Sequence, residues 1–174
     1  RIEKASDPDR FHDTQHLWLR VLPAGCVQVG LDPLAARLLG PGASLELMPA
    51  GTRLSRGETA ATMSVAGEPV RFASPLTGEV LRVHRVRPGR FPSMLAHPYS
   101  RAWLFILSVP RLGKRLSSFL FGRNAGLCLA REWAAVQEEC LGLAARTAGM
   151  PGSLPDGGEL DLVRLSGSAG PAYP

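Results

Sequence analysis

Lysine is almost absent from this 174-residue chain. Lysine and arginine together number 20 and the net charge is +5, yet the only lysines are Lys4 and Lys114. Arginine therefore supplies almost all of the positive charge. Because a guanidinium stays protonated and is not nucleophilic, arginine cannot replace an amine in amide chemistry. No lysine lies between residues 5 and 113, and this excludes any covalent attachment to a side-chain amine over more than half of the chain.

Cysteine and long apolar runs are also scarce. The three cysteines are an odd number without CxxC spacing, which argues against a disulfide framework and favours thiols in a reducing compartment; they are Cys26, Cys128 and Cys140. No apolar stretch approaches the ~20 residues of a membrane span. The opening residues, RIEKASDPDR, contain no apolar core of a signal peptide. We therefore expect a cytoplasmic protein.

Motifs for catalysis or metal binding are missing as well. The four histidines are dispersed and form no pair at ligand spacing; they are His12, His16, His84 and His97. Nucleophile-elbow, phosphate-loop and dinucleotide-binding patterns are absent, and no paired carboxylates stand out for acid–base work. The sequence predicts no enzyme, no metal and no cofactor.

Short apolar runs separated by glycine turns fill residues 16–109. Gly57, Gly67, Gly78 and Gly89 recur at roughly ten-residue intervals, which is typical of an all-β sandwich or barrel. We predict strands over 16–22, 26–30, 45–48, 52–54, 59–65, 70–73, 79–86 and 103–109. One helix is expected after Asp32, which would act as its N-cap, with Pro33 at the first position and Gly40 as the stop.

The pattern changes after Pro110. Leu112, Leu116, Phe119 and Leu120 lie on one helical face, and Gly122–Gly126 interrupts it. A second apolar stripe then follows at helical spacing: Leu129, Trp133, Val136, Cys140 and Leu143. We therefore divide the chain into a lead-in (1–15), a β-rich domain (16–109), a helical extension (110–148) and a flexible tail (149–174).

Several segments of the β-rich domain, in order, resemble the H protein of the glycine cleavage system, a relative of lipoyl and biotinyl domains. Those segments are His16-Leu-Trp-Leu, the strand and short helix over 27–40, Leu45–Thr52 with Ser55–Glu58, Ser74-Pro-Leu-Thr-Gly-Glu-Val80, and His97-Pro-Tyr-Ser-Arg-Ala-Trp-Leu104. The resemblance implies a mostly β barrel-sandwich hybrid with a short internal helix and a C-terminal helical extension.

The resemblance also implies a lysine that carries lipoic acid, located just before the Ser-Pro segment. Counting back from Ser74-Pro75 without gaps places Gly67 at that position and Ser64 at the acidic position before it. The stretch SVAGEPVRFASPLTGEV thus keeps the expected hairpin and lacks its lysine. Gly67 itself fits an ordinary tight turn that needs a positive φ, and the alternative is a remodelled tip that docks to a partner.

These observations favour a non-catalytic, non-lipoylated H-protein-like subunit that binds protein partners in a larger assembly. A second copy could also bind through the C-terminal helices. The candidate partner-binding residues are Ser64, Gly67, Glu68, Arg71, Arg82, Arg85, Arg87 and Trp133.

Two alternatives remain open. A cysteine-dependent carrier or redox protein would need an exposed thiol with a lowered pKa. Nucleic-acid binding through the basic segment 82–90 has charge in its favour, but no aromatic residues interleave with the arginines to stack on bases. An acidic protein is the better partner for that segment.

Overall fold

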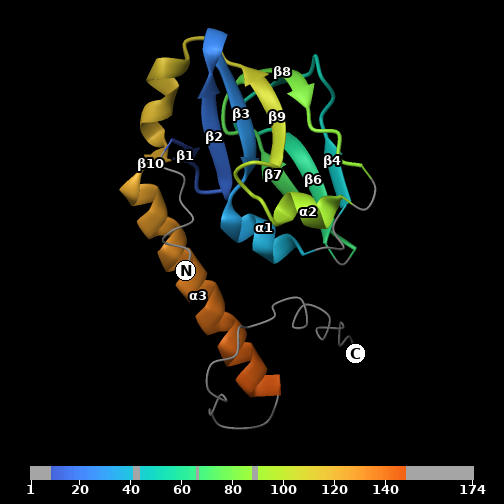
Figure 1. The fold of residues 1–174 in the computed structure, drawn as a ribbon, viewed down its shortest axis with the longest axis vertical. Helices are drawn as coiled ribbons and strands as arrows, with labels where there is room; N and C mark the ends of the chain where they lie inside the picture. Colours follow the sequence, from blue (N-terminus) through green and yellow to red (C-terminus); the bar gives the residue numbers. More distant parts are fainter. Residues whose placement is uncertain (1–8, 41–43, 66, 88–89, 148–174) are drawn as a thin grey trace.

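The chain folds into two antiparallel β-sheets with helices at one end and along one side (Figure 1). The structure is a computed structural model that describes residues 9–40, 44–65, 67–87 and 90–147. The larger sheet has the order β10 (Leu120–Phe121), β1 (Phe11–His12), β2 (Leu17–Leu22), β3 (Cys26–Leu31), β9 (Trp103–Ser108), β8 (Gly78–Val83) and β5 (Arg53–Leu54). The smaller sheet has the order β4 (Ser44–Leu47), β6 (Thr59–Val65) and β7 (Glu68–Ala73).

Turn chemistry explains why β2 and β3 form the expected hairpin. The two strands are joined by η2 (Pro23–Gly25), a short 3-10 turn in which Ala24 and Gly25 have φ values of 59° and 71°. Glycine adopts such a φ without steric cost. The turn pairs Leu22 with Cys26 and places Leu19 opposite Val29. Both central side chains then face the core, as the alternating sequence pattern predicts.

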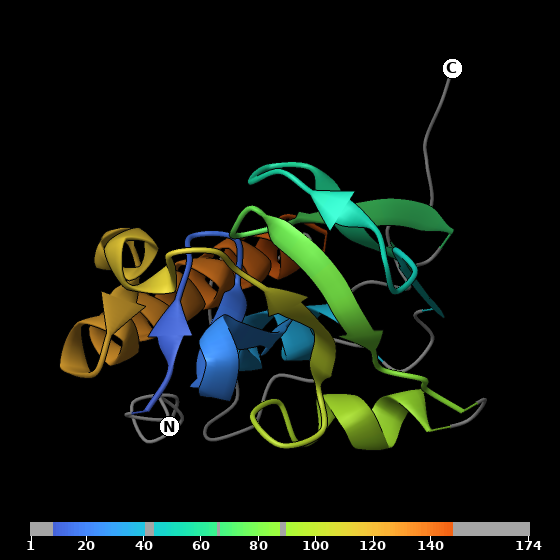
Figure 2. The same cartoon turned by 90° about the horizontal axis from the view of Figure 1, so that it is seen from above.

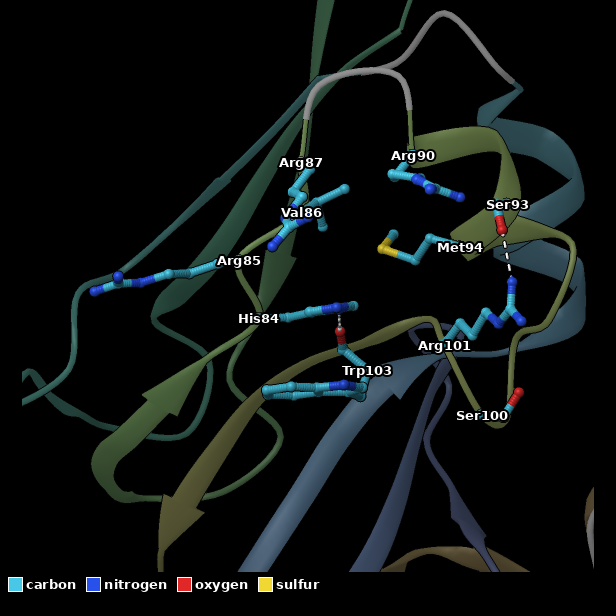
Figure 3. Close-up of a pocket in the computed structure, with 10 residues that line it drawn as sticks. All are labelled: His84, Arg85, Val86, Arg87, Arg90, Ser93, Met94, Ser100, Arg101 and Trp103. Carbon is cyan, nitrogen blue, oxygen red and sulfur yellow. Dashed lines mark hydrogen bonds between the residues drawn. The ribbon is translucent and has the colours of Figure 1, made fainter.

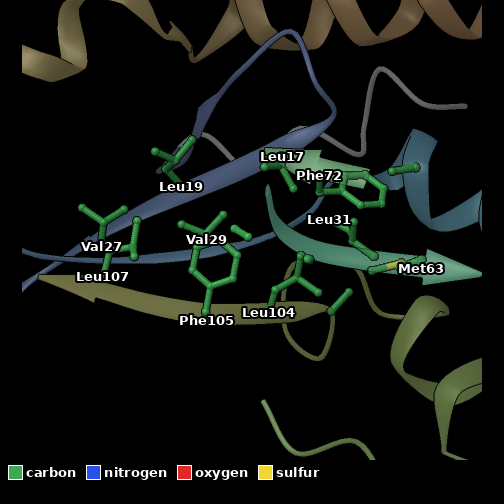
Figure 4. Close-up of a cluster of buried hydrophobic side chains, with 14 of the residues drawn as sticks. Leu17, Leu19, Val27, Val29, Leu31, Met63, Phe72, Leu104, Phe105 and Leu107 are labelled. Carbon is green, nitrogen blue, oxygen red and sulfur yellow. The ribbon is translucent and has the colours of Figure 1, made fainter. Parts of the chain in front are cut away.

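The core fills the space between the two sheets. Side chains of β2, β3 and β9 meet those of β6 and β7 there, and Figure 4 shows Leu19, Val29 and Phe105 on one side with Met63 and Phe72 on the other. Burying this apolar surface is the main favourable contribution to folding. It also holds the ends of β6 and β7 in place, which positions the hairpin between them.

Gly30 and Trp18 pack against each other without spare room. Trp18 is fully buried, and its Nε1 donates a hydrogen bond to the carbonyl oxygen of Pro98 at 3.0 Å. A Cβ on Gly30 would lie 2.3 Å from the Trp18 ring and 2.6 Å from the carbonyl oxygen of Ala102. Only glycine fits here, because any Cβ would overlap both the indole ring and that carbonyl oxygen.

The first helix follows the sequence prediction and a second helix was missed. Helix α1 spans Pro33–Leu39, the Asp32 carboxylate accepts a hydrogen bond from the Ala35 N–H at 2.8 Å, and Gly40 has a φ of 67°. Helix α2 (Phe91–Leu95) buries Phe91, Met94 and Leu95. Both helices lie at the lower end of the barrel in Figure 1, and Figure 2 shows the chain passing from the arrowhead of β8 into α2.

The ends of the domain are joined in a way that the sequence did not reveal. Residues expected in a lead-in form β1, which pairs Phe11 with Leu19 of β2 and with Phe121 of β10. Arg10 is buried beside β1, with its guanidinium carbon 4.2 Å from the centroid of the Trp18 ring. The two Phe rings are 4.6 Å apart. Long-range strand pairing of this kind has no local sequence signal.

The extension differs from the expected pair of helices. Residues Leu112–Ser118 form a 3-10 helix, η3, which follows Arg111 in a left-handed conformation (φ 55°), and the chain then turns into β10. A single helix, α3, runs over Arg123–Thr147 without the expected break near Gly126. Figure 1 shows α3 starting beside the barrel and extending beyond it. No helix among the described residues is long and apolar enough to cross a membrane.

Candidate functional site

The β6–β7 hairpin presents Gly67 to solvent. The two strands pair Ser64 with Pro69 and Val65 with Glu68, so Gly67 lies in the turn that joins them. Gly67 is exposed with a φ of 90°, and a Cβ built on it would meet no atom within 4 Å. Glycine is therefore required here by backbone conformation and not by crowding. Of the other predicted residues, Ser64 is half-buried, whereas Glu68 and Arg71 are exposed.

Lys114 is the one lysine among the residues that the structure describes, and the fold places it away from the hairpin tip. Lys114 lies in η3, where it lines a cavity of about 320 Å³ together with Arg56 and Thr77. Thr77 follows the end of β7 that is remote from the hairpin turn. A lysine amine at this end of the barrel cannot occupy the position of Gly67.

The basic segment after β8 forms a second candidate site. His84 stacks on Trp103 with ring centroids 4.5 Å apart and 8° between the planes, and its Nδ1 lies 2.7 Å from the Trp103 carbonyl oxygen. Arg82 lies on β8 with its guanidinium carbon 5.6 Å from the centroid of the Trp103 ring. Arg85 and Arg87, both exposed, line a cavity of about 320 Å³ beside this stack.

Arg101 of that cavity was not among the sequence candidates, whereas Arg90 belongs to the predicted basic segment 82–90. Arg90 and Arg101 also line it, and Figure 3 shows them on the side of α2, near Met94. Arg101 donates a hydrogen bond to Ser93 Oγ at 2.7 Å. Arg101 is far from segment 82–90 along the chain, so charge counting within one segment could not find it. The proximity of His97-Pro-Tyr-Ser-Arg to the basic segment depends on the β8–β9 pairing.

Trp133 lies on α3 and faces the barrel. It packs, together with Val136, against a small buried cluster made by Leu34 of α1 and Leu129 of α3. The guanidinium carbon of Arg37 is 5.1 Å from the centroid of the Trp133 ring. The first part of the predicted stripe therefore attaches the helix to its own domain. Leu143, near the end of the stripe, is 45% exposed.

No hydrogen bond or ion pair among the described residues joins the three groups of candidates. The hairpin residues, the basic segment and Trp133 each lie on a different part of the fold. The structure thus presents two separate surfaces, the hairpin tip and the basic cavity, and a helix face that is already partly used in packing.

His16 links the barrel to α3. Its φ of 63° directs the ring toward Asp32, and Nδ1 lies 3.2 Å from Asp32 Oδ2 and 3.9 Å from Glu132 Oε2. The hydrogen bond to Asp32 raises the pKa of His16, although partial burial acts in the opposite direction. These contacts give His16 a structural role between the barrel and α3.

The three cysteines are free thiols and each is half-buried. Burial raises the pKa of Cys128, and the Glu132 carboxylate, with Oε1 3.6 Å from Sγ, adds to the effect. A raised pKa lowers the fraction of reactive thiolate, so Cys128 is a poor nucleophile. Cys26 is 3.9 Å from the carbonyl oxygen of Ala24.

The two-sheet architecture defines the class of protein. It is a mostly β barrel-sandwich hybrid with a C-terminal helix, the architecture of lipoyl-type domains. The crystal structure of a glycine cleavage system H protein from Mycobacterium marinum has the same fold. The match has a TM-score of 0.53 at 21% sequence identity and covers 62% of this chain and 89% of that one.

Sequence comparison places the chain within this class. The family model described as "Glycine cleavage H-protein" matches residues 10–124, more than half of the chain. The H protein of Chromobacterium violaceum is 35% identical over 94 residues, which cover 52% of this chain and 70% of that protein. The H protein of Aeromonas hydrophila is 29% identical over 101 residues, covering 58% and 78%. The chain belongs to the glycine cleavage H-protein family.

Proposed function

We propose that this chain is an H-protein-like subunit that carries no lipoyl group, catalyses no reaction and binds protein partners in a larger assembly. The observation that carries the proposal is the hairpin tip, where an exposed glycine lies at the position that the family resemblance assigns to the lipoyl lysine. Gly67 has no side chain to modify. No lysine lies within residues 5–113.

The chemistry of the attachment supports this conclusion. A lipoyl amide forms on a neutral primary amine, and the guanidinium of Arg71, the basic side chain of the hairpin, stays protonated. Lys114 is in η3 and lines a cavity with Thr77, at the other end of β7. Neither group can serve as the end of a swinging arm at the hairpin.

The exposed face of the hairpin is the proposed partner surface. Glu68, Pro69, Val70 and Arg71 are consecutive and exposed, and they follow Gly67 directly. Side chains alternate along β7, so Glu68 and Val70, which is 39% exposed, lie on one face of the strand, and Pro69 and Arg71 lie on the other. Because the chain belongs to the H-protein family, the enzyme subunits of the glycine cleavage system are the first candidate partners for these side chains, with Arg71 as the charged contact.

The first experiment tests whether the chain can be lipoylated. The purified chain is incubated with lipoate, ATP and a lipoate–protein ligase, and its intact mass is measured. We expect no lipoyl increment. The matched variant is Gly67→Lys, whose side chain would enter open space, and the H protein of Aeromonas hydrophila serves as the positive control. A lipoyl increment on the unaltered chain, at either lysine, would contradict the proposal.

The second experiment tests the partner surface. Binding of the host's glycine cleavage enzyme subunits is measured by surface plasmon resonance for the chain and for Arg71→Glu. A reversed charge at a contacting position is expected to weaken binding at least tenfold, about 1.4 kcal/mol. Arg20→Glu, an exposed change on β2, is the control with the same charge difference. Absence of binding, or equal loss in both variants, would refute this use of the hairpin.

A further inference from the structure

The basic cavity beside α2 has an excess of positive charge that the fold does not use. Four arginines line its volume of about 320 Å³, from three separate segments: Arg85, Arg87, Arg90 and Arg101. Among the described residues, no carboxylate side chain lines the cavity and none forms an ion pair with any of the four arginines. Like charges gathered in a concave site raise the local concentration of anions.

Two of the cavity's polar groups are held in fixed orientations. The guanidinium of Arg101 donates to Ser93 Oγ at 2.7 Å, which uses one of its five N–H groups and leaves the others available. His84 is fixed by its stacking on Trp103 and by its Nδ1 contact with the Trp103 carbonyl oxygen. Groups positioned before binding lose little conformational freedom when a ligand arrives.

Figure 3 shows how the side chains surround the space. Arg90 and Arg101 lie on the side of α2 with Met94 between them, and the His84–Trp103 stack lies below. Arg85 points away from the other sticks. Arg90 and Arg101 thus line one side of the cavity, and the stacked rings of His84 and Trp103 line another. The buried side chain of Met94 also lines it. Its volume falls in the range of small-molecule sites.

We propose that this cavity binds a small anionic metabolite through a carboxylate or phosphate group. Arg90 and Arg101 bind the oxyanion, because the planar guanidinium matches both groups with paired N–H donors. The His84–Trp103 stack contacts the uncharged part of the ligand. This inference does not depend on the state of the hairpin, and a lipoylation result in either direction leaves it unaffected.

A titration of the full chain tests the proposal. Isothermal titration calorimetry is performed at low ionic strength with inorganic phosphate and, separately, with succinate as a dicarboxylate. We expect saturable one-to-one binding of at least one probe, and the tighter probe identifies the phosphate or carboxylate source. Arg90→Gln and Arg101→Gln are each expected to weaken binding about tenfold or more, since a charge-assisted pair is lost.

Matched variants distinguish binding at a specific anion site from a general effect of positive surface charge. Arg20→Gln removes one exposed positive charge from β2 and is expected to leave the affinity unchanged within about twofold, the small effect of a remote surface charge. Arg101→Lys keeps the charge but loses the planar fork, and we expect a loss approaching that of Arg101→Gln. Thermal unfolding confirms that each variant is folded. Equal losses in Arg20→Gln and Arg90→Gln would overturn the proposal.

Two other outcomes of the binding experiments would indicate a macromolecular ligand. Failure of both small anions to saturate the site, with binding of a glutamate-rich peptide, would replace the metabolite by an acidic protein. Failure of both anions with steeply salt-dependent binding of a single-stranded oligonucleotide would instead support the nucleic-acid interpretation of segment 82–90. Either outcome refutes a small-molecule site.

Discussion

Gly30 and Gly67 are both glycines of the same barrel, and opposite physical requirements explain them. At Gly30 a Cβ would lie 2.3 Å from the Trp18 ring, whereas at Gly67 it would meet nothing within 4 Å. The first glycine is required by packing and the second by a φ of 90° alone. The comparison shows that packing excludes a side chain at Gly30, whereas at Gly67 the surrounding space is open and only the backbone conformation favours glycine.

Adding a methyl group at Gly30 is the largest expected disruption. Gly30→Ala should lower the free energy of unfolding by about 3 kcal/mol, the upper end of the usual cost of overpacking, because a buried ring and a carbonyl oxygen both block the Cβ. Urea unfolding followed by fluorescence measures the change.

A double-mutant cycle sharpens this result. Trp18→Phe removes ring atoms that a Cβ on Gly30 would strike and leaves the Ala102 carbonyl oxygen in place. The cost of Gly30→Ala should therefore be smaller in the Trp18→Phe background than in the unaltered chain. Additive costs would show that the indole does not set the requirement for glycine.

The same substitution at the hairpin tip should be milder. Gly67→Ala is expected to cost about 1 kcal/mol, since its Cβ would crowd its own backbone at this positive φ but would meet no other part of the structure. The same urea experiment measures it, and Gly67→Asn, which tolerates a positive φ better, should be nearer to the unaltered chain. A cost for Gly67→Ala equal to that for Gly30→Ala would remove the distinction between the two sites.

The smallest expected effect is the pH dependence of the contact between the barrel and α3. The folded pKa of His16 is raised above its ordinary value of about 6.5, so its contribution is fully present below that pH and is lost as the pH rises through the folded pKa. His16→Asn should accordingly cost more stability at pH 6 than at pH 8.5. Asparagine is chosen because it accepts the φ of 63°.

Other charges around His16 determine how the pH experiment is read. Asp32 and Glu132 face the imidazole from α1's cap and from α3, and Asp13 lies nearby with a pKa raised by burial. Comparing the two proteins at each pH subtracts the part of their titration that does not involve His16. An equal cost at both pH values would mean that the imidazolium form is not favoured by folding.

The sequence predicted those features that have local causes. Asp32, Pro33 and Gly40 define helix α1 within nine residues, and the chain adopts the helix that their capping chemistry favours. The exposed turn at Gly67 likewise follows from a local pattern between two strands.

Features that depend on contacts between residues far apart in the chain could not be predicted from the sequence. Phe11 pairs with Phe121, and Arg101 joins Arg90 only after β8 and β9 have aligned. The apolar period of residues 112–120 predicts a helix, but the chain forms a 3-10 turn and then the strand that β1 requires. Competition from strand pairing, absent from any local window, decides that outcome.

The pairing of β1 with β10 makes the extension part of the barrel's boundary. If the chain were cut after Pro110, the outer strand would be lost and the backbone groups of Phe11 and His12 that face β10 would be left open. Open strand edges recruit other chains and promote aggregation. The segment that leads into α3 therefore protects this strand edge from pairing with other chains, and removing it would not leave an intact domain.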